Sequence, residues 1–162
     1  MANFDLQLST HFHLSEFISS QTAARRRIDN TPSPAVITAL TALCQHVLEP
    51  VRRQFGPVKV SSGYRSPALN RAVGGSKTSQ HVLGQAADIE CPGVANGDLA
   101  RWIARNCDFD QMILEFYTPG QPSSGWVHVS WRPTDRRRQT LTAARVRTMG
   151  LLRTQYLPGI AT

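Results

Sequence analysis

The chain has 162 residues, 41% of them hydrophobic and 18% charged, which fits one compact domain and excludes a disordered or fibrous protein. Its 18 Lys and Arg residues outnumber its 11 Asp and Glu residues and give a formal net charge of +7. Such a balance suggests nucleic-acid binding, but residues 1–130 carry 11 basic and 10 acidic groups, whereas residues 131–162 carry seven Arg and one Asp. Because the first 130 residues are nearly neutral and contain no nucleic-acid motif, we expect no nucleic-acid partner.

Nothing in the sequence predicts a membrane span or export. No window approaches the roughly 20 uninterrupted apolar residues of a transmembrane helix, and residues 1–10 lack the basic and apolar regions of a secretory signal. The cysteines Cys44, Cys91 and Cys107 show no C-x-x-C spacing, so we expect reduced, buried thiols. These features predict synthesis in a cytoplasm without a signal peptide.

Helices are predicted in the first half of the chain. A short helix is predicted to begin after residues 13–15, with Ser15 as its N-cap, and a turn cluster at residues 29–32 leads to Ser33 and Pro34, a helix cap and a first helical residue. Apolar residues then recur at helical spacing as far as Phe55, and Pro50 within this stretch predicts a kink or a break into two helices.

Strands dominate the second half. The segments 58–61, 86–90, 109–117 and 126–131 are predicted strands, and a helix at 98–106 separates the second from the third. The last two of these strands are joined by a turn-rich segment at 118–125. Helices followed by strands predict the α+β class. The arginine-rich end of the chain is expected to be partly helical and to pack back on the domain.

Two of the five histidines lie in contexts typical of a metal site. His81 follows a Gly- and Ser-rich loop and precedes Asp88 by seven residues, and His128 lies on a predicted strand. Two imidazoles and a carboxylate form a catalytic zinc site that keeps a fourth position for water. Taken alone, this spacing is also consistent with polar groups on a sheet face. The pair His11 and His13 is a weaker metal candidate, and His46 is expected to be structural.

Three ordered motifs resemble the zinc D-Ala-D-Ala peptidases: S-G-Y-R-S at residues 62–66, S-x-H-x-x-G-x-A-x-D at residues 79–88, and W-x-H at residues 126–128. That family includes D,D-carboxypeptidases, vancomycin-resistance dipeptidases and phage endolysins, with the Hedgehog signalling domain as a distant relative. The resemblance spans about residues 12–132 and is nearest to the phage-type carboxypeptidase domain. It implies a small α+β domain at residues 1–133, in which an antiparallel sheet carries a zinc site and packs with N-terminal helices. Residues 134–162 would be a basic C-terminal extension.

The resemblance also implies the roles of individual residues. His81, Asp88 and His128 match the ligands of one Zn²⁺ ion, Arg65 matches an arginine that contacts substrate near the scissile bond or its terminal carboxylate, and Ser79 matches a substrate-contacting serine. A guanidinium suits a carboxylate or a developing oxyanion.

The general base is less directly indicated. Many relatives carry an acidic residue three positions before the last histidine, where this chain has Gly125. Glu115 is the preferred substitute, with Glu90 as its rival, and Asp110 or no base at all as remaining alternatives.

The function implied is hydrolysis of peptidoglycan stem peptides by a D-Ala-D-Ala carboxypeptidase or an endopeptidase. The protein would be a monomeric phage endolysin or a virion-associated wall hydrolase, acting at the cell wall after release from the cytoplasm. The alternative is a catalytically inactive, metal-containing wall-binding module, and a nucleic-acid-binding protein ranks last. The basic extension is either a solvated end or a segment attracted to anionic envelope polymers or lipid headgroups.

Overall fold

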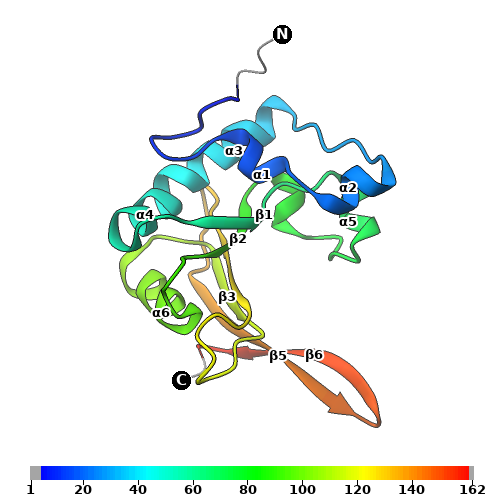
Figure 1. The fold of residues 1–162 in the computed structure, drawn as a ribbon, viewed down its shortest axis with the longest axis vertical. Helices are drawn as coiled ribbons and strands as arrows, with labels where there is room; N and C mark the ends of the chain where they lie inside the picture. Colours follow the sequence, from blue (N-terminus) through cyan, green and yellow to red (C-terminus); the bar gives the residue numbers. More distant parts are fainter. Residues whose placement is uncertain (1–4, 161–162) are drawn as a thin grey trace.

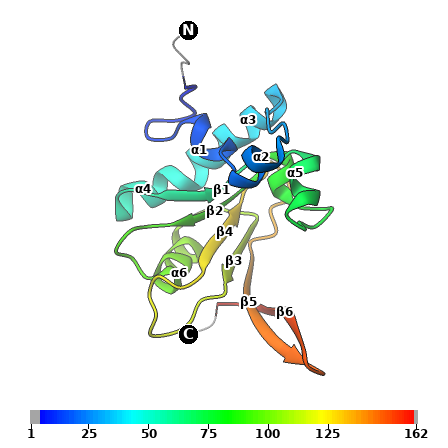
Figure 2. The same cartoon turned by 45° about the vertical axis from the view of Figure 1, so that its right-hand side comes forward.

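The computed structural model describes residues 5–160 and confirms the α+β class. Six strands form one sheet in the order β1-β2-β4-β3-β5-β6. Helices of the first half gather beside β1, α6 lies next to β3 and β4, and the hairpin β5–β6 projects at the opposite end (Figures 1 and 2). The strands are β1 (Lys59–Ser62), β2 (Ala86–Glu90), β3 (Gln111–Glu115), β4 (Trp126–Ser130), β5 (Gln139–Thr148) and β6 (Leu151–Pro158). The helices are α1 (Leu14–Ile18), α2 (Gln21–Arg26), α3 (Pro34–Leu43), α4 (Glu49–Phe55), α5 (Pro67–Ala72) and α6 (Asn96–Asn106), with a π-helical turn η1 (Cys44–Leu48) and a 3₁₀ turn η2 (Gln80–Leu83).

The long apolar helix adapts to Pro50 without breaking. Ser33 caps α3 by accepting a hydrogen bond from the amide of Val36, and α3 runs through η1 into α4. At the end of η1 the backbone amide of Glu49 donates a hydrogen bond to the carbonyl oxygen of Cys44, five residues earlier in the chain. This wider turn lies directly before Pro50, which has no N–H to donate and whose ring crowds the preceding turn. The predicted kink therefore takes the form of a π-helical turn.

The helical stretch Pro34–Phe55 is, within residues 5–160, the one helix whose length and composition would allow a membrane span. Length and composition are weak indicators, because the core helix of a globular domain meets the same criteria. Here the stretch contributes Leu40, Leu43, Val47 and Val51, each fully buried, to the hydrophobic core. The same core receives Val127 and Val129 of β4, which project from one face of the strand.

The sheet is antiparallel where it carries the candidate site and mixed as a whole. β1, β2, β4 and β3 are joined by antiparallel pairing, which places Asp88 opposite His128 and Glu115 opposite Trp126. β5, however, pairs parallel to β3, so the expected antiparallel sheet describes only part of the structure.

The expectation of a partly helical C-terminal end is wrong. Residues 139–158 form an antiparallel hairpin whose two-residue turn is Met149 and Gly150, both with positive φ, as the twist of a tight hairpin requires. Thr140, Thr142, Val146 and Thr148 are β-branched residues, which favour a pleated strand over a helix.

Arginines at the start of this end tie it to the domain. Arg132 and Arg137 form ion pairs with the fully buried Asp110, and Arg136 and Arg138 with Asp108. We call these four arginines and two aspartates the arginine anchor. It holds the segment between β4 and β5 and so fixes where β5 meets β3.

Candidate metal centre and its cavity

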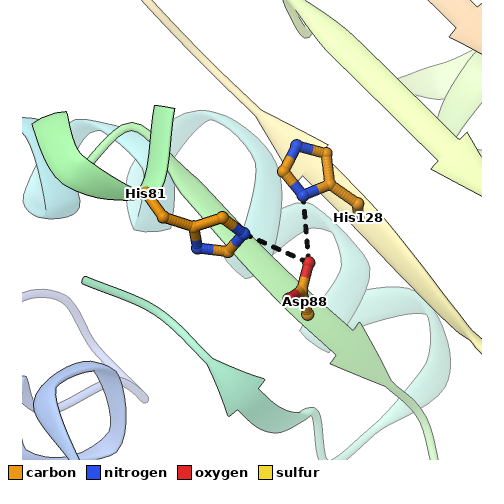
Figure 3. A group of neighbouring side chains, drawn as sticks. All are labelled: His81, Asp88 and His128. Carbon is orange, nitrogen blue, oxygen red and sulfur yellow. Dashed lines mark hydrogen bonds and ion pairs between the residues drawn. The ribbon is translucent and has the colours of Figure 1, made fainter. Parts of the chain in front are cut away.

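Three separate elements bring the candidate ligands together. His81 lies on the turn η2, Asp88 on β2 and His128 on β4, directly opposite Asp88 in the strand register. Nε2 of His81 is 3.3 Å and Nδ1 of His128 is 3.0 Å from Oδ1 of Asp88. Figure 3 shows both rings turned toward the carboxylate. All three side chains are buried, and their ligand atoms lie within 4.8 Å of one another, close enough to share one metal ion.

Hydrogen bonding prepares His81 to act as a ligand. Its Nδ1 lies 2.6 Å from the carbonyl oxygen of Gly63. A carbonyl can only accept, so Nδ1 carries the proton and Nε2, which faces Asp88, keeps its lone pair. In the neutral ring this contact selects the tautomer whose Nε2 can bind a metal.

The carboxylate of Asp88 is held in its charged form. Burial by itself would raise the pKa of Asp88, but the imidazoles of His81 and His128 outweigh it and lower that pKa well below its ordinary value. Two imidazoles and one carboxylate are the donor set of a catalytic zinc site. The residues present therefore fit a Zn²⁺ ion.

Close packing explains the glycine of the S-G-Y-R-S motif. A Cβ atom on Gly63 would lie 2.6 Å from the carbonyl oxygen of Phe17, and the next residue, Tyr64, donates its amide to that same carbonyl. The loop thus packs directly on α1. Only a residue without a side chain lets the Gly63 carbonyl reach His81.

Arg65 is tied to the candidate ligands on one side and to a buried amide on the other. Its Nη2 is 3.6 Å from Oδ2 of Asp88, and its Nε and Nη1 donate to Ser62 and Asn70 at 3.2 and 3.3 Å. Asn70 also donates to the carbonyl of Ser76 in the glycine-rich loop. The guanidinium is therefore held in place before any substrate arrives.

Asn70 is a positioning residue that the sequence analysis missed. It lies in the helix α5 and is almost fully buried. A signal was present, because asparagine is a weak helix former and tends to occupy a helix interior when its amide has a partner.

The three candidates for the general base, Glu115, Glu90 and Asp110, lie in different parts of the structure. Glu115 lines the cavity that contains the candidate ligands, and burial and the nearby Asp88 raise its pKa above the ordinary 4.5. Glu90 lines a different cavity, beside Lys59. Asp110 is covered by the arginine anchor.

Gly125 lies three positions before His128, where the chain departs from the pattern of the family that it resembles. A Cβ atom there would lie 1.9 Å from the backbone oxygen of Glu115, and the φ of Gly125 is +64°. No acidic side chain fits at residue 125 of this fold, because the backbone of the preceding strand occupies the space. This explains why the chain departs from the pattern at that position.

One cavity of about 560 Å³ joins all six of the residues implied by the resemblance. Ser79 lines it as well, and its Oγ accepts the amide of His81 at 3.3 Å, so it caps η2. This volume is large enough for several residues of a peptide, and the walls carry the candidate ligands and three charged side chains, Arg65, Glu115 and Arg137. The six residues are Arg65, Ser79, His81, Asp88, Glu115 and His128.

Two of the three remaining histidines, His11 and His46, have structural contacts. Nδ1 of His11 is 2.7 Å from Glu49, and the ring of His46 stacks on Trp131 at 4.1 Å. Within residues 5–160, one set of three or more His, Cys, Asp or Glu side chains is placed to hold a metal ion, and it consists of His81, Asp88 and His128. The cysteines are free and buried, as expected.

Comparison with known proteins agrees with this geometry. A model of a family described as Peptidase M15 matches residues 10–130. The match covers most of the chain, contains the six residues named above and ends with the last residue of β4. A search of curated proteins finds no match.

Proposed function

This chain belongs to the peptidase M15 family, whose members are zinc metallopeptidases, and we propose that it hydrolyses the stem peptides of peptidoglycan. The observation that carries the proposal is one cavity that joins a His-Asp-His ligand set to Glu115 and Arg65. When bound, zinc polarises a peptide carbonyl and acidifies a water molecule.

Glu115 is suited to proton transfer in this reaction. It lies outside the ligand set but in the same cavity, and its raised pKa brings it nearer to the operating pH. It would accept a proton from the attacking water and give a proton to the leaving amine. Partial burial of Glu115 limits competing contacts with solvent.

Arg65 is suited to bind negative charge on the substrate. The guanidinium is oriented by Ser62 and Asn70, so little conformational entropy remains to be lost on binding. It would donate hydrogen bonds to the carbonyl oxygen as negative charge develops there, or to the terminal carboxylate of the stem peptide.

Matched carboxylate variants test this function. Glu115→Gln should keep zinc content and thermal stability but lower kcat on purified peptidoglycan by about 10²–10⁴-fold, the range expected for loss of a general base. Glu90→Gln, in a separate cavity, should retain wild-type activity. Full activity of Glu115→Gln would refute the role of Glu115, and binding of the wild type to peptidoglycan without cleavage would favour the inactive wall-binding module.

The bond that is cut defines the finer function. The resemblance to phage-type carboxypeptidase domains supports a narrower form of the proposal, a monomeric endolysin or virion-associated hydrolase acting at the bacterial cell wall. Mass spectrometry of the digest separates loss of a terminal D-Ala from cleavage inside the stem or at a cross-link. Release of D-Ala alone would support the carboxypeptidase form, and release of larger fragments would support the endopeptidase form.

The hairpin supports a proposed attraction to anionic envelope polymers. Arg145, Arg147 and Arg153 form no ion pair with any residue of the described part of the chain, in contrast to the arginines of the arginine anchor. These three arginines therefore leave positive charge available to an anionic surface. Point substitutions suit the test better than truncation, because residues 134–162 include β5, which pairs with β3.

A further inference from the structure

The hairpin that follows the family match forms part of the wall of the catalytic cavity. Leu141 of β5 and Tyr156 of β6 line the same cavity as the candidate ligands, although the match ends at residue 130. The hairpin is the orange and red element in Figure 2. Residues outside the family's common segment therefore shape the space in which the peptide would bind.

The strand register places Tyr156 in line with Glu115. Glu115 pairs with Ala143 of β5, and Ala143 pairs with Tyr156 of β6. Residues paired across a sheet project from the same face, and two strand spacings amount to about 10 Å. The small side chain of Ala143 lies between the two longer ones. Tyr156 and Glu115 thus line the cavity from the same face of the sheet, with room between them.

The hydroxyl of Tyr156 is a donor without a partner in the described part of the protein. The residue is 55% exposed, and no described residue hydrogen-bonds its phenol group. Burial of its inner part and the charge of Glu115 raise the pKa of Tyr156 above its ordinary value of 10, so the hydroxyl keeps its proton at neutral pH. A neutral phenol that lines a peptide-sized cavity is able to donate to a carbonyl or carboxylate oxygen.

The hairpin is held firmly where Tyr156 is placed. Arg145 lies over the ring of Phe116 at 4.9 Å, and the amide of Phe116 donates to the carbonyl of Ala143 at 2.9 Å. Together with the arginine anchor, these contacts fix the inner half of the hairpin against β3. A contact made from Tyr156 would therefore be preorganised.

We propose that Tyr156 contacts the bound stem peptide, with its hydroxyl donating a hydrogen bond to a carbonyl or carboxylate oxygen near Glu115. This inference rests on the proposed peptidase function and adds a substrate-binding residue to it. It assigns part of the substrate specificity to the hairpin, which lies beyond the segment shared with the family.

Tyr156→Phe tests the hydroxyl alone, because the ring and its apolar contacts remain. The control is Tyr117→Phe, since Tyr117 packs on Gly97 of α6 and does not line the cavity. On zinc-loaded enzyme with the pentapeptide L-Ala-γ-D-Glu-L-Lys-D-Ala-D-Ala, Tyr156→Phe should lower kcat/KM by about 10-fold, the value of one hydrogen bond. Zinc content and Tm should equal those of wild type. Equal kcat/KM for Tyr156→Phe and wild type would overturn the proposal.

A second measurement does not depend on turnover or on any change at residue 156. In the Glu115→Gln protein, with and without zinc, saturating pentapeptide should protect Tyr156 from nitration by tetranitromethane and leave Tyr117 as reactive as before. Peptide mapping by mass spectrometry reports both residues. Unprotected Tyr156 in protein that binds the pentapeptide overturns the Tyr156 contact but not the peptidase function. A wild-type protein that neither binds nor cleaves the pentapeptide overturns both.

Discussion

Replacing Asp110 by Asn tests whether the arginine anchor stabilises the fold. Asp110 is fully buried and accepts hydrogen bonds from the backbone and side chain of Arg137 and from Gln80. Burial alone would raise the pKa of Asp110, but these donors lower it from 3.8 to about 2. Each unit of pKa is worth about 1.4 kcal/mol, so the ionised carboxylate contributes about 2 kcal/mol to the free energy of unfolding at neutral pH.

The expected effect has a defined dependence on pH. Because the pKa of Asp110 is lower in the folded state, its contribution is complete above about pH 4 and disappears as pH falls through about 2. Asp110→Asn should therefore be about 2 kcal/mol less stable than wild type at pH 7, equivalent to about 4–8 °C in Tm. The difference should shrink between pH 4 and pH 2.

Urea unfolding followed by tryptophan fluorescence measures this difference at each pH. The control is Asp98→Asn, which breaks an exposed pair with Arg101 on α6 and should cost well under 1 kcal/mol. Equal stability of Asp110→Asn and wild type at pH 7 would refute the reasoning. A difference that persists undiminished at pH 2 would show that shape, rather than charge, is responsible.

Three further predictions concern the metal, the substrate arginine and the hairpin charge. Dialysis against EDTA should abolish hydrolysis, and one equivalent of Zn²⁺ should restore it; activity that survives full removal of metal contradicts the zinc mechanism. Gly75→Ala would place a Cβ atom 2.0 Å from Oδ1 of Asn70 and 3.1 Å from Nη1 of Arg65. The displaced guanidinium should lower kcat/KM about 10²-fold at unchanged zinc content. Wild-type kinetics of this variant would show that the reaction does not require Arg65 to be held by Asn70. The double variant Arg147→Gln/Arg153→Gln should sediment less with intact cell walls at low salt and match wild type at high salt, whereas equal sedimentation at low salt would remove the proposed attraction.

The metal centre was predictable from sequence because short motifs carry it. The spacing of His81 and Asp88 and the alternation around His128 depend on local turn and strand geometry, and the strand register then brings all three together. Glu115 was harder to assign. Its position in the cavity of the candidate ligands depends on strand pairing, and no local pattern records the close approach of β3 to Gly125.

The C-terminal end was mispredicted because its determinants are distant in the chain. Leu141, Ala144 and Leu152 recur at a helical spacing, so periodicity alone favoured a helix. The ion pair between Arg137 and Asp110 joins residues 27 positions apart. The positive charge of this end was visible in the sequence, but its division into an anchoring part and a free part depends on partners that only the fold supplies.

The parallel pairing of β5 with β3 decides which strand forms the edge of the sheet. In the strand order of the sheet, β3 would be an edge strand if the chain ended where the family match does. Its backbone donors and acceptors would be unpaired beside the apolar residues Met112 and Leu114, a surface on which other chains can add strands and aggregate. The hairpin replaces that edge with β6, which carries Arg153 and Pro158, residue types that discourage such pairing. A segment that looks like a charged appendage in the sequence thereby supplies the strand that pairs with the backbone of β3.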